Sequence, residues 1–97
     1  MVNFFHFEEL RILGRQLLRR STSIAANFRA ACRARSSAEH YAKLCIVVEE
    51  CDETLFWLDL IASTGLIESE YLKNCQQETT KLLMVFAKTR KKLKPKP

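Results

Sequence analysis

Residues 41–62 carry apolar side chains at alternating intervals of three and four positions. The repeat consists of Tyr41, Leu44, Val48, Cys51, Leu55, Leu58 and Ala62. Such heptad spacing is typical of helices that pack nearly parallel or antiparallel, as they do in helical bundles. Further apolar residues of the same segment lie off this repeat, namely Cys45, Ile46, Phe56, Trp57, Leu60 and Ile61. An apolar surface this wide needs neighbours on more than one side of the helix.

Residues that break helices are scarce in this chain. It has 97 residues with only two glycines and two prolines, and both prolines lie among the last three residues. Few breakers over such a length favour long helices over a β fold with many turns. We therefore predict an all-α fold, an antiparallel up-and-down bundle with three helices in this chain. A single domain is expected over residues 1–93, with helices at about 7–33, 37–63 and 68–93 and a disordered basic tail at 94–97.

Two local signals place the ends of the second helix. Ser36 and Glu39 have the spacing of a capping box, in which each side chain accepts a hydrogen bond from a backbone N–H at the start of the helix. Gly65 can adopt the left-handed conformation that ends a helix, with Leu66 placed for the hydrophobic contact that accompanies it. The connections are therefore short, and consecutive helices should be antiparallel neighbours.

Three helices can cover one apolar side of the second helix but not both. A chain this short buries a modest fraction of its surface and gains stability from association. We therefore expect a homo-oligomer. The apolar side chains that lie off the heptad repeat are the candidate oligomer interface: Phe56, Trp57, Leu60 and Ile61.

Arginine side chains cluster on one side of the first predicted helix. At about 100° per residue, five arginines fall within roughly 80° of one another, while Arg20 lies off this stripe. The five, called here the basic face, are Arg11, Arg15, Arg19, Arg29 and Arg33. An opposite, core-facing side is expected to hold Leu10, Leu13, Leu17, Leu18, Ile24, Ala25, Phe28, Ala31 and Cys32. The candidate nucleic-acid-binding residues are the basic face together with Arg35.

Charge is also segregated along the chain, whose net charge is +5. Eight basic residues and one acid lie in residues 11–43, eight acids and one lysine in 49–78, and seven basic residues without an acid from residue 81 onward. Three interpretations of the basic face remain open. It is solvated and partly paired with acids of the second helix, it binds a polyanion such as RNA or DNA through phosphates, or it meets the 49–59 acids of another subunit. No base-reading motif supports sequence-specific recognition.

Other functional classes have little support in the residue pattern. Cys32, Cys45, Cys51 and Cys75 lie within apolar periodic segments, and we interpret them as small buried side chains in a reducing compartment. Ser21, Thr22 and Ser23 are interpreted as a site of close helix approach, with the small side chain of Ser21 facing the core. A catalytic serine is not expected, because no residue is placed to activate it. We expect no catalytic residue, metal site, cofactor or small-molecule substrate. No membrane span or signal peptide is visible, so a cytoplasmic location is expected.

Two segments resemble a known family. GRQLLRRSTSIAANFRAACRARS (Gly14–Ser36) and AEHYAKLCIVVEECDETLFWLDLIASTGLI (Ala38–Ile67) are similar to the four-helix-bundle proteins called 23S ribosomal RNA intervening-sequence proteins. The most specific parts are the segment Gln16–Asn27, the aromatic residue after Glu39, and the ETLFWLDL and GLI stretches that close the second helix.

The resemblance implies an antiparallel up-and-down bundle that assembles as a ring-like homopentamer and has no enzymatic activity. Related bundle proteins are nucleic-acid-binding accessories of diversity-generating retroelements, which makes Arg15, Arg19, Arg29 and Arg33 candidate polyanion contacts. Asn27 is implied to be a structural polar residue between helices. The family pattern has a full helix before the GRQLLR segment, where this sequence has only residues 1–13. The sequence is therefore expected to be a natural short form, the product of a misassigned start codon, or a three-helix remnant.

These observations together predict a non-enzymatic, homo-oligomeric helical protein. Its basic face would bind RNA or DNA through phosphates without base specificity. The alternative is a structural or protein-binding oligomer with no nucleic-acid role, in which the arginines are solvated or paired between subunits.

Overall fold

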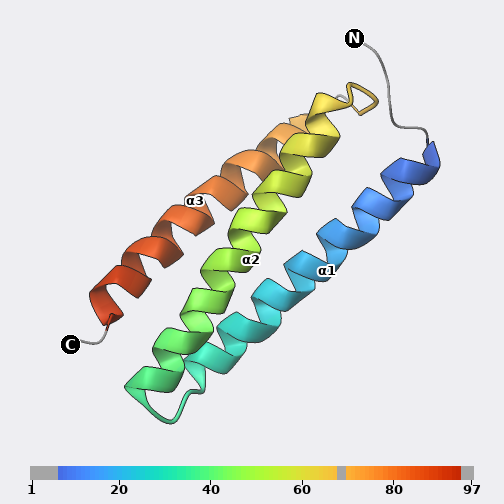
Figure 1. The fold of residues 1–97 in the computed structure, drawn as a ribbon. Helices are drawn as coiled ribbons and strands as arrows, with labels where there is room; N and C mark the ends of the chain where they lie inside the picture. The colour runs from blue at the N-terminus through green and yellow to red at the C-terminus, as the bar shows by residue number, and fades with distance from the viewer. Residues whose placement is uncertain (1–6, 68–69, 95–97) are drawn as a thin grey trace.

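Three α-helices make up the described part of the chain. The computed structural model describes residues 7–67 and 70–94, and its helices are α1 (Phe7–Cys32), α2 (Ser37–Ser63) and α3 (Glu70–Leu93). They run antiparallel in sequence order, as Figure 1 shows. The predicted all-α bundle is confirmed. The predictions for residues 1–6, 68–69 and 95–97 lie outside the described residues.

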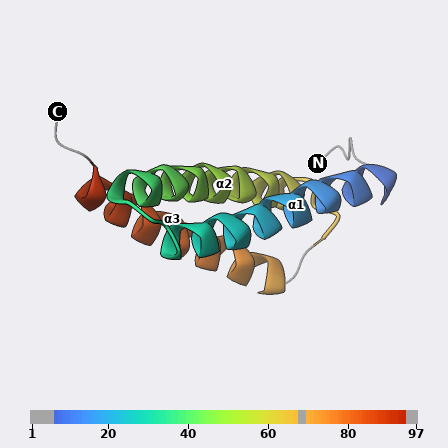
Figure 2. The same cartoon turned by 90° about the horizontal axis from the view of Figure 1, so that it is seen from below.

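Helix α2 is the central one of the three described helices. Both α1 and α3 pack against it, and Figure 2 shows that they lie on the same side of it. The buried side chains of α2 are Leu44, Val47, Val48, Cys51, Thr54, Leu58 and Ile61. The resulting bundle measures 49 × 23 × 20 Å. The backbones of α1 and α3 each lie close to that of α2 but, within the described residues, not close to each other.

The ends of α2 have local causes that are visible in the sequence. Ser36 is the N-cap, and its hydroxyl oxygen accepts a hydrogen bond from the Glu39 N–H at 3.1 Å. The Glu39 carboxylate accepts from the Arg35 N–H at 3.4 Å, one residue earlier than a capping box requires. At the other end, Gly65 has a φ of 71°, which glycine adopts without steric cost, and the helix ends there.

A histidine ties the first connection together. Nδ1 of His40, in the first turn of α2, lies 2.6 Å from the carbonyl oxygen of Ala31 in the last turn of α1. Only a protonated Nδ1 can donate to a carbonyl, so the hydrogen bond fixes which ring nitrogen carries the proton. The contact joins the two helices at one end of the bundle.

Fewer residues of α1 are buried than the sequence predicts. Leu13 and Ala31 are buried, but Leu18 is 68% exposed and Phe28 is 42% exposed, and Ala25 is also exposed. The cause is the helix arrangement, because α1 is covered along a narrow strip by α2. Phe28 meets α3 through Phe86, with ring centroids 5.3 Å apart.

Two smaller predictions fail for the same reason. Ser21 does not face the core: it is exposed, and its hydroxyl donates to the Leu17 carbonyl within α1 at 2.9 Å. Among the four free cysteines, Cys51 is buried and Cys45 and Cys75 are half-buried, whereas Cys32 is exposed and was wrongly expected in the core. Both misplaced side chains lie on the part of α1 that α2 does not reach.

Candidate functional site

The basic face lies on the outward side of the bundle. α1 is one continuous helix, so Arg11, Arg15, Arg19 and Arg29 keep the spacing that places them on a common side. Arg33 follows in the turn after α1, and its N–H still donates to the Arg29 carbonyl at 3.2 Å. Arg35 lies in the connection to α2. All six side chains are exposed.

Most of these arginines are not engaged with acids of their own chain. Arg11 contacts Glu8 at 3.4 Å in an exposed pair three residues apart, a type of pair that contributes little. Within residues 7–67 and 70–94, Arg15, Arg19, Arg29 and Arg33 have no carboxylate within ion-pair distance. Their charge is therefore directed at solvent or at a partner.

The arginine that pairs with α2 is Arg20, which lies off the basic face. Its guanidinium contacts Glu50 at 3.3 Å and Glu53 at 2.9 Å, and the Glu50 side chain is only 16% exposed. The Nε of Arg20 is buried, and its N–H is not directed at the Glu53 oxygen, so that contact is an ion pair without a directed hydrogen bond. The ion pairs between α1 and α2 among the described residues therefore involve no residue of the basic face.

The polar residue Asn27 forms its hydrogen bonds within α1. Its side-chain amide donates to the carbonyl and the hydroxyl of Ser23, at 3.0 and 3.2 Å. Asn27 is half-buried, and both of these hydrogen bonds are made within its own helix and not to another helix.

The candidate oligomer interface on the outer side of α2 is smaller than expected. Phe56 is 59% exposed and stacks edge-on against Trp57, with ring centroids 5.3 Å apart. Trp57 and Leu60 are half-buried. Ile61 is only 6% exposed, because it points into the core between the helices, and its assignment to the surface was wrong.

A groove between α1 and α3, with α2 as its floor, was missed by the sequence analysis. It has a volume of about 460 Å³ and is lined by Gly14, Leu17, Leu18, Ser21, Thr54, Leu58, Tyr71, Cys75, Glu78 and Thr79. A signal for it was present in the sequence. A set of exposed residues on α1 recurs at alternating intervals of four and three positions. The set consists of Gly14, Leu18, Ser21, Ala25, Phe28 and Cys32. These residues form a second heptad stripe on α1, and its first three members, Gly14, Leu18 and Ser21, line the groove.

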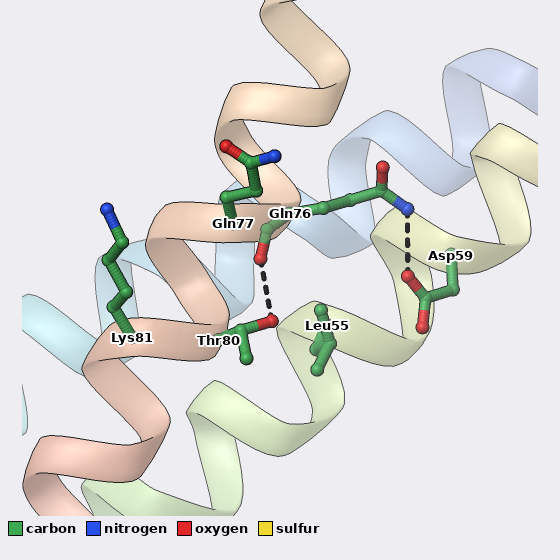
Figure 3. A pocket seen from close by; sticks show the side chains of 6 residues that line it. All are labelled: Leu55, Asp59, Gln76, Gln77, Thr80 and Lys81. Carbon is green, nitrogen blue, oxygen red and sulfur yellow. Dashed lines mark hydrogen bonds between the residues drawn. The ribbon is translucent and has the colours of Figure 1, made fainter.

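A second hollow lies on the other side of α3, where it meets α2. Figure 3 shows its lining from both helices, with Gln76 donating to the Asp59 carboxylate at 2.9 Å. The Thr80 hydroxyl donates to the Gln76 carbonyl at 2.8 Å. Because these hydrogen bonds are already made within the hollow, it offers few free polar groups to a small molecule.

Two further observations concern metals and membranes. Within residues 7–67 and 70–94, no three His, Cys, Asp or Glu side chains gather where they could hold a metal ion. None of the helices in that part of the chain is long and apolar enough to cross a membrane.

Comparison with protein families shows which family this chain matches. Residues 1–88 match the model of the family described as 23S rRNA-intervening sequence protein. The chain belongs to this family. The family resemblance found in the sequence is thus confirmed, and the shared helical arrangement extends to a solved structure.

That structure is a crystal structure of a protein of unknown function from the S23 ribosomal protein family of Bacteroides thetaiotaomicron VPI-5482. It is 34% identical to this member of the 23S rRNA-intervening sequence protein family, with a TM-score of 0.76. The match covers 82% of this chain and 71% of the other. The comparison with curated proteins found no match.

Proposed function

We propose that this protein is a non-enzymatic, cytoplasmic homo-oligomer whose basic face binds RNA or DNA through phosphates, without reading the bases. The observation that supports this proposal is the state of the arginines. Arg15, Arg19, Arg29 and Arg33 are exposed, and within the described residues no acid of the same chain pairs with them. Arg20, the arginine that pairs with acids of α2, does not belong to the basic face.

Phosphate is the partner that suits these side chains. The planar guanidinium presents paired N–H donors that match two phosphate oxygens, and several clustered guanidinium groups raise the rate at which a polyanion is captured. A protein of this kind holds nucleic acid through its charge, so binding should depend on salt and vary little with sequence.

The direct test is a charge reversal on the basic face. The variant with Arg15→Glu and Arg29→Glu should lose binding to a mixed-sequence RNA and to a mixed-sequence DNA duplex, measured by fluorescence anisotropy. The matched control is Lys73→Glu with Lys81→Glu, which changes the net charge equally at exposed lysines of α3. Equal loss in both variants, or no binding by the wild type at low salt, would contradict the proposal.

Self-association is the second part of the proposal. Large apolar side chains are exposed on two sides of the bundle, among them Leu18 at 68%, Val85 at 58% and Phe56 at 59%. Surfaces of this kind mark places where another chain is expected to pack. The family resemblance makes a homopentamer the expected assembly, and light scattering at micromolar concentration measures its mass.

A structural oligomer with no nucleic-acid role is the alternative function. The same exposed apolar side chains favour it, because a protein partner is needed to bury them. The basic face needs no such partner, since charged side chains can remain in solvent. In that case the wild type would form a defined oligomer by light scattering and would bind no RNA or DNA at low salt.

A further inference from the structure

Two basic segments that are far apart in the sequence meet at one end of the bundle. Figure 1 shows the α1–α2 connection and the C-terminal end of α3 at the same end. Two observations support this placement. Phe28 of α1 packs against Phe86 of α3 at 5.3 Å between ring centroids. The Arg90 guanidinium is near enough to Tyr41 of α2 to act on its pKa, lowering it against a larger rise that is caused mainly by a hydrogen bond with Cys45.

This end of the molecule, called here the basic end, concentrates positive charge. Its basic residues are Arg29, Arg33, Arg35, Lys43, Lys88, Arg90, Lys91, Lys92 and Lys94. The same segments, residues 29–43 and 86–94, contain one acid, Glu39. The basic end therefore has a formal charge of +8, which leaves −3 on the rest of a chain whose total is +5. Lys43 and Arg90 are half-buried and the other seven are exposed.

Helix stability accounts for only part of this charge. Cations near the C-termini of α1 and α3 interact favourably with the helix dipoles, an effect that is confined to the last turn. Arg35 lies beyond α1, and Lys43 lies in the second turn of α2, so neither belongs to the last turn of a helix. Among the described residues, no member of the basic end is in an ion pair with a carboxylate.

We propose that the basic end binds the backbone of a double-stranded nucleic acid, with its two sides contacting phosphates of different strands. One side is α1 with its connection, including Arg33 and Arg35, and the other is the end of α3, including Lys91 and Lys92. This inference rests on the proposed function and names the surface and the form of the ligand. It adds α3 residues that the basic face does not include.

The dimensions fit a duplex. Packed helices lie about 8–10 Å apart. In the part of the chain that the structure describes, α1 and α3 each pack along α2, but their backbones do not come close to each other. The separation of α1 and α3 is therefore larger than one helix spacing, on the scale of the major groove of B-DNA, which is about 12 Å wide. The bundle is 23 × 20 Å in cross-section, comparable with one duplex. A single strand offers one row of phosphates and would engage one side of the basic end at a time.

Two double variants test the two sides separately. One is Arg33→Gln with Arg35→Gln, and the other is Lys91→Gln with Lys92→Gln. The matched control removes the same charge elsewhere on α3, with Lys73→Gln and Lys81→Gln. The probes are a 20-base-pair DNA duplex, an RNA duplex of the same sequence, and one of the single strands. Fluorescence anisotropy gives Kd at several salt concentrations, and circular dichroism checks that each variant is helical.

Each basic-end variant should weaken duplex binding about tenfold or more at 0.1 M salt and reduce the salt slope by about two. The control should stay within about twofold of the wild type, and the single strand should bind more weakly than either duplex. A loss confined to one side, a control that loses as much, or a single strand that binds as tightly as the duplex overturns the inference while leaving the proposed function intact. A wild type that binds none of the probes overturns both.

Discussion

Arg19 and Arg20 are adjacent in the sequence and have different roles in the structure. Arg19 is exposed on the outward side of α1, whereas Arg20 is half-buried against α2 and contacts Glu50 and Glu53. The sequence predicted that Arg20 lies off the basic face, because the helical period separates the two residues by about 100°. It did not identify the partners of Arg20, because which acids of α2 it reaches depends on the register between two helices.

The Arg20 contacts should contribute measurably to stability. The change Arg20→Ala leaves the largely buried Glu50 carboxylate without its partner, which should lower the free energy of unfolding by about 1–2 kcal/mol. Arg15→Ala, at an exposed position without an ion pair in the described structure, should change it by less than about 0.5 kcal/mol. Urea unfolding followed by circular dichroism measures both. If both variants lose the same stability, the Arg20 contacts are not stabilising.

Each helix differs in how completely its sequence predicts its packing. For α2, the heptad repeat identifies the buried side, and Leu44, Val48, Cys51 and Leu58 are all buried. For α1, the apolar residues span a wider arc than one neighbour can cover, and their spacing does not say which part of the arc is covered. That division is set by where α3 lies, since α3 contacts the stripe from Gly14 to Cys32 at Phe28 and leaves its other members exposed.

Two glycines should respond in opposite ways to the same substitution. Gly14 lies inside α1, and a Cβ there would meet nothing within 4 Å, so Gly14→Ala should stabilise the protein by about 0.5–1 kcal/mol. Gly65 ends α2 with a φ of 71°, so Gly65→Ala should destabilise it by about 1–2 kcal/mol. Thermal unfolding should show Tm shifts of about 4–8 °C per kcal/mol. Shifts of the same sign would contradict the local structures assigned to the two residues.

The charge distribution of the whole molecule follows from topology. The sequence shows basic segments near residue 33 and after residue 81, with acids between them. Because the three helices alternate in direction, the ends of α1 and α3 meet, and charge that is segregated along the chain becomes charge segregated between the two ends of a bundle 49 Å long. The groove on α2 was not predicted, because its walls come from two helices whose separation depends on how each of them packs against α2.

Self-association should depend on the apolar lining of that groove. The double variant Leu18→Asp with Tyr71→Asp changes two side chains of the groove lining that are 68% and 78% exposed, so the fold of the isolated chain should tolerate it. Light scattering should then show a smaller species than the wild type forms. Phe56→Asp, on the outer side of α2, tests the other candidate surface in the same way. A wild type that is a well-folded monomer at micromolar concentration would contradict the prediction of an oligomer.

The salt dependence of nucleic-acid binding tests the proposed function most directly. Kd for a mixed-sequence duplex should be measured for the wild type between 0.05 and 0.2 M salt, conditions over which counterion release is readily resolved. Binding through about five phosphates predicts a slope of about −4 to −5 in a plot of log affinity against log salt concentration. The same slope should be found for a duplex of unrelated sequence. An affinity that does not change with salt, or binding to one sequence only, would contradict a phosphate-directed interaction.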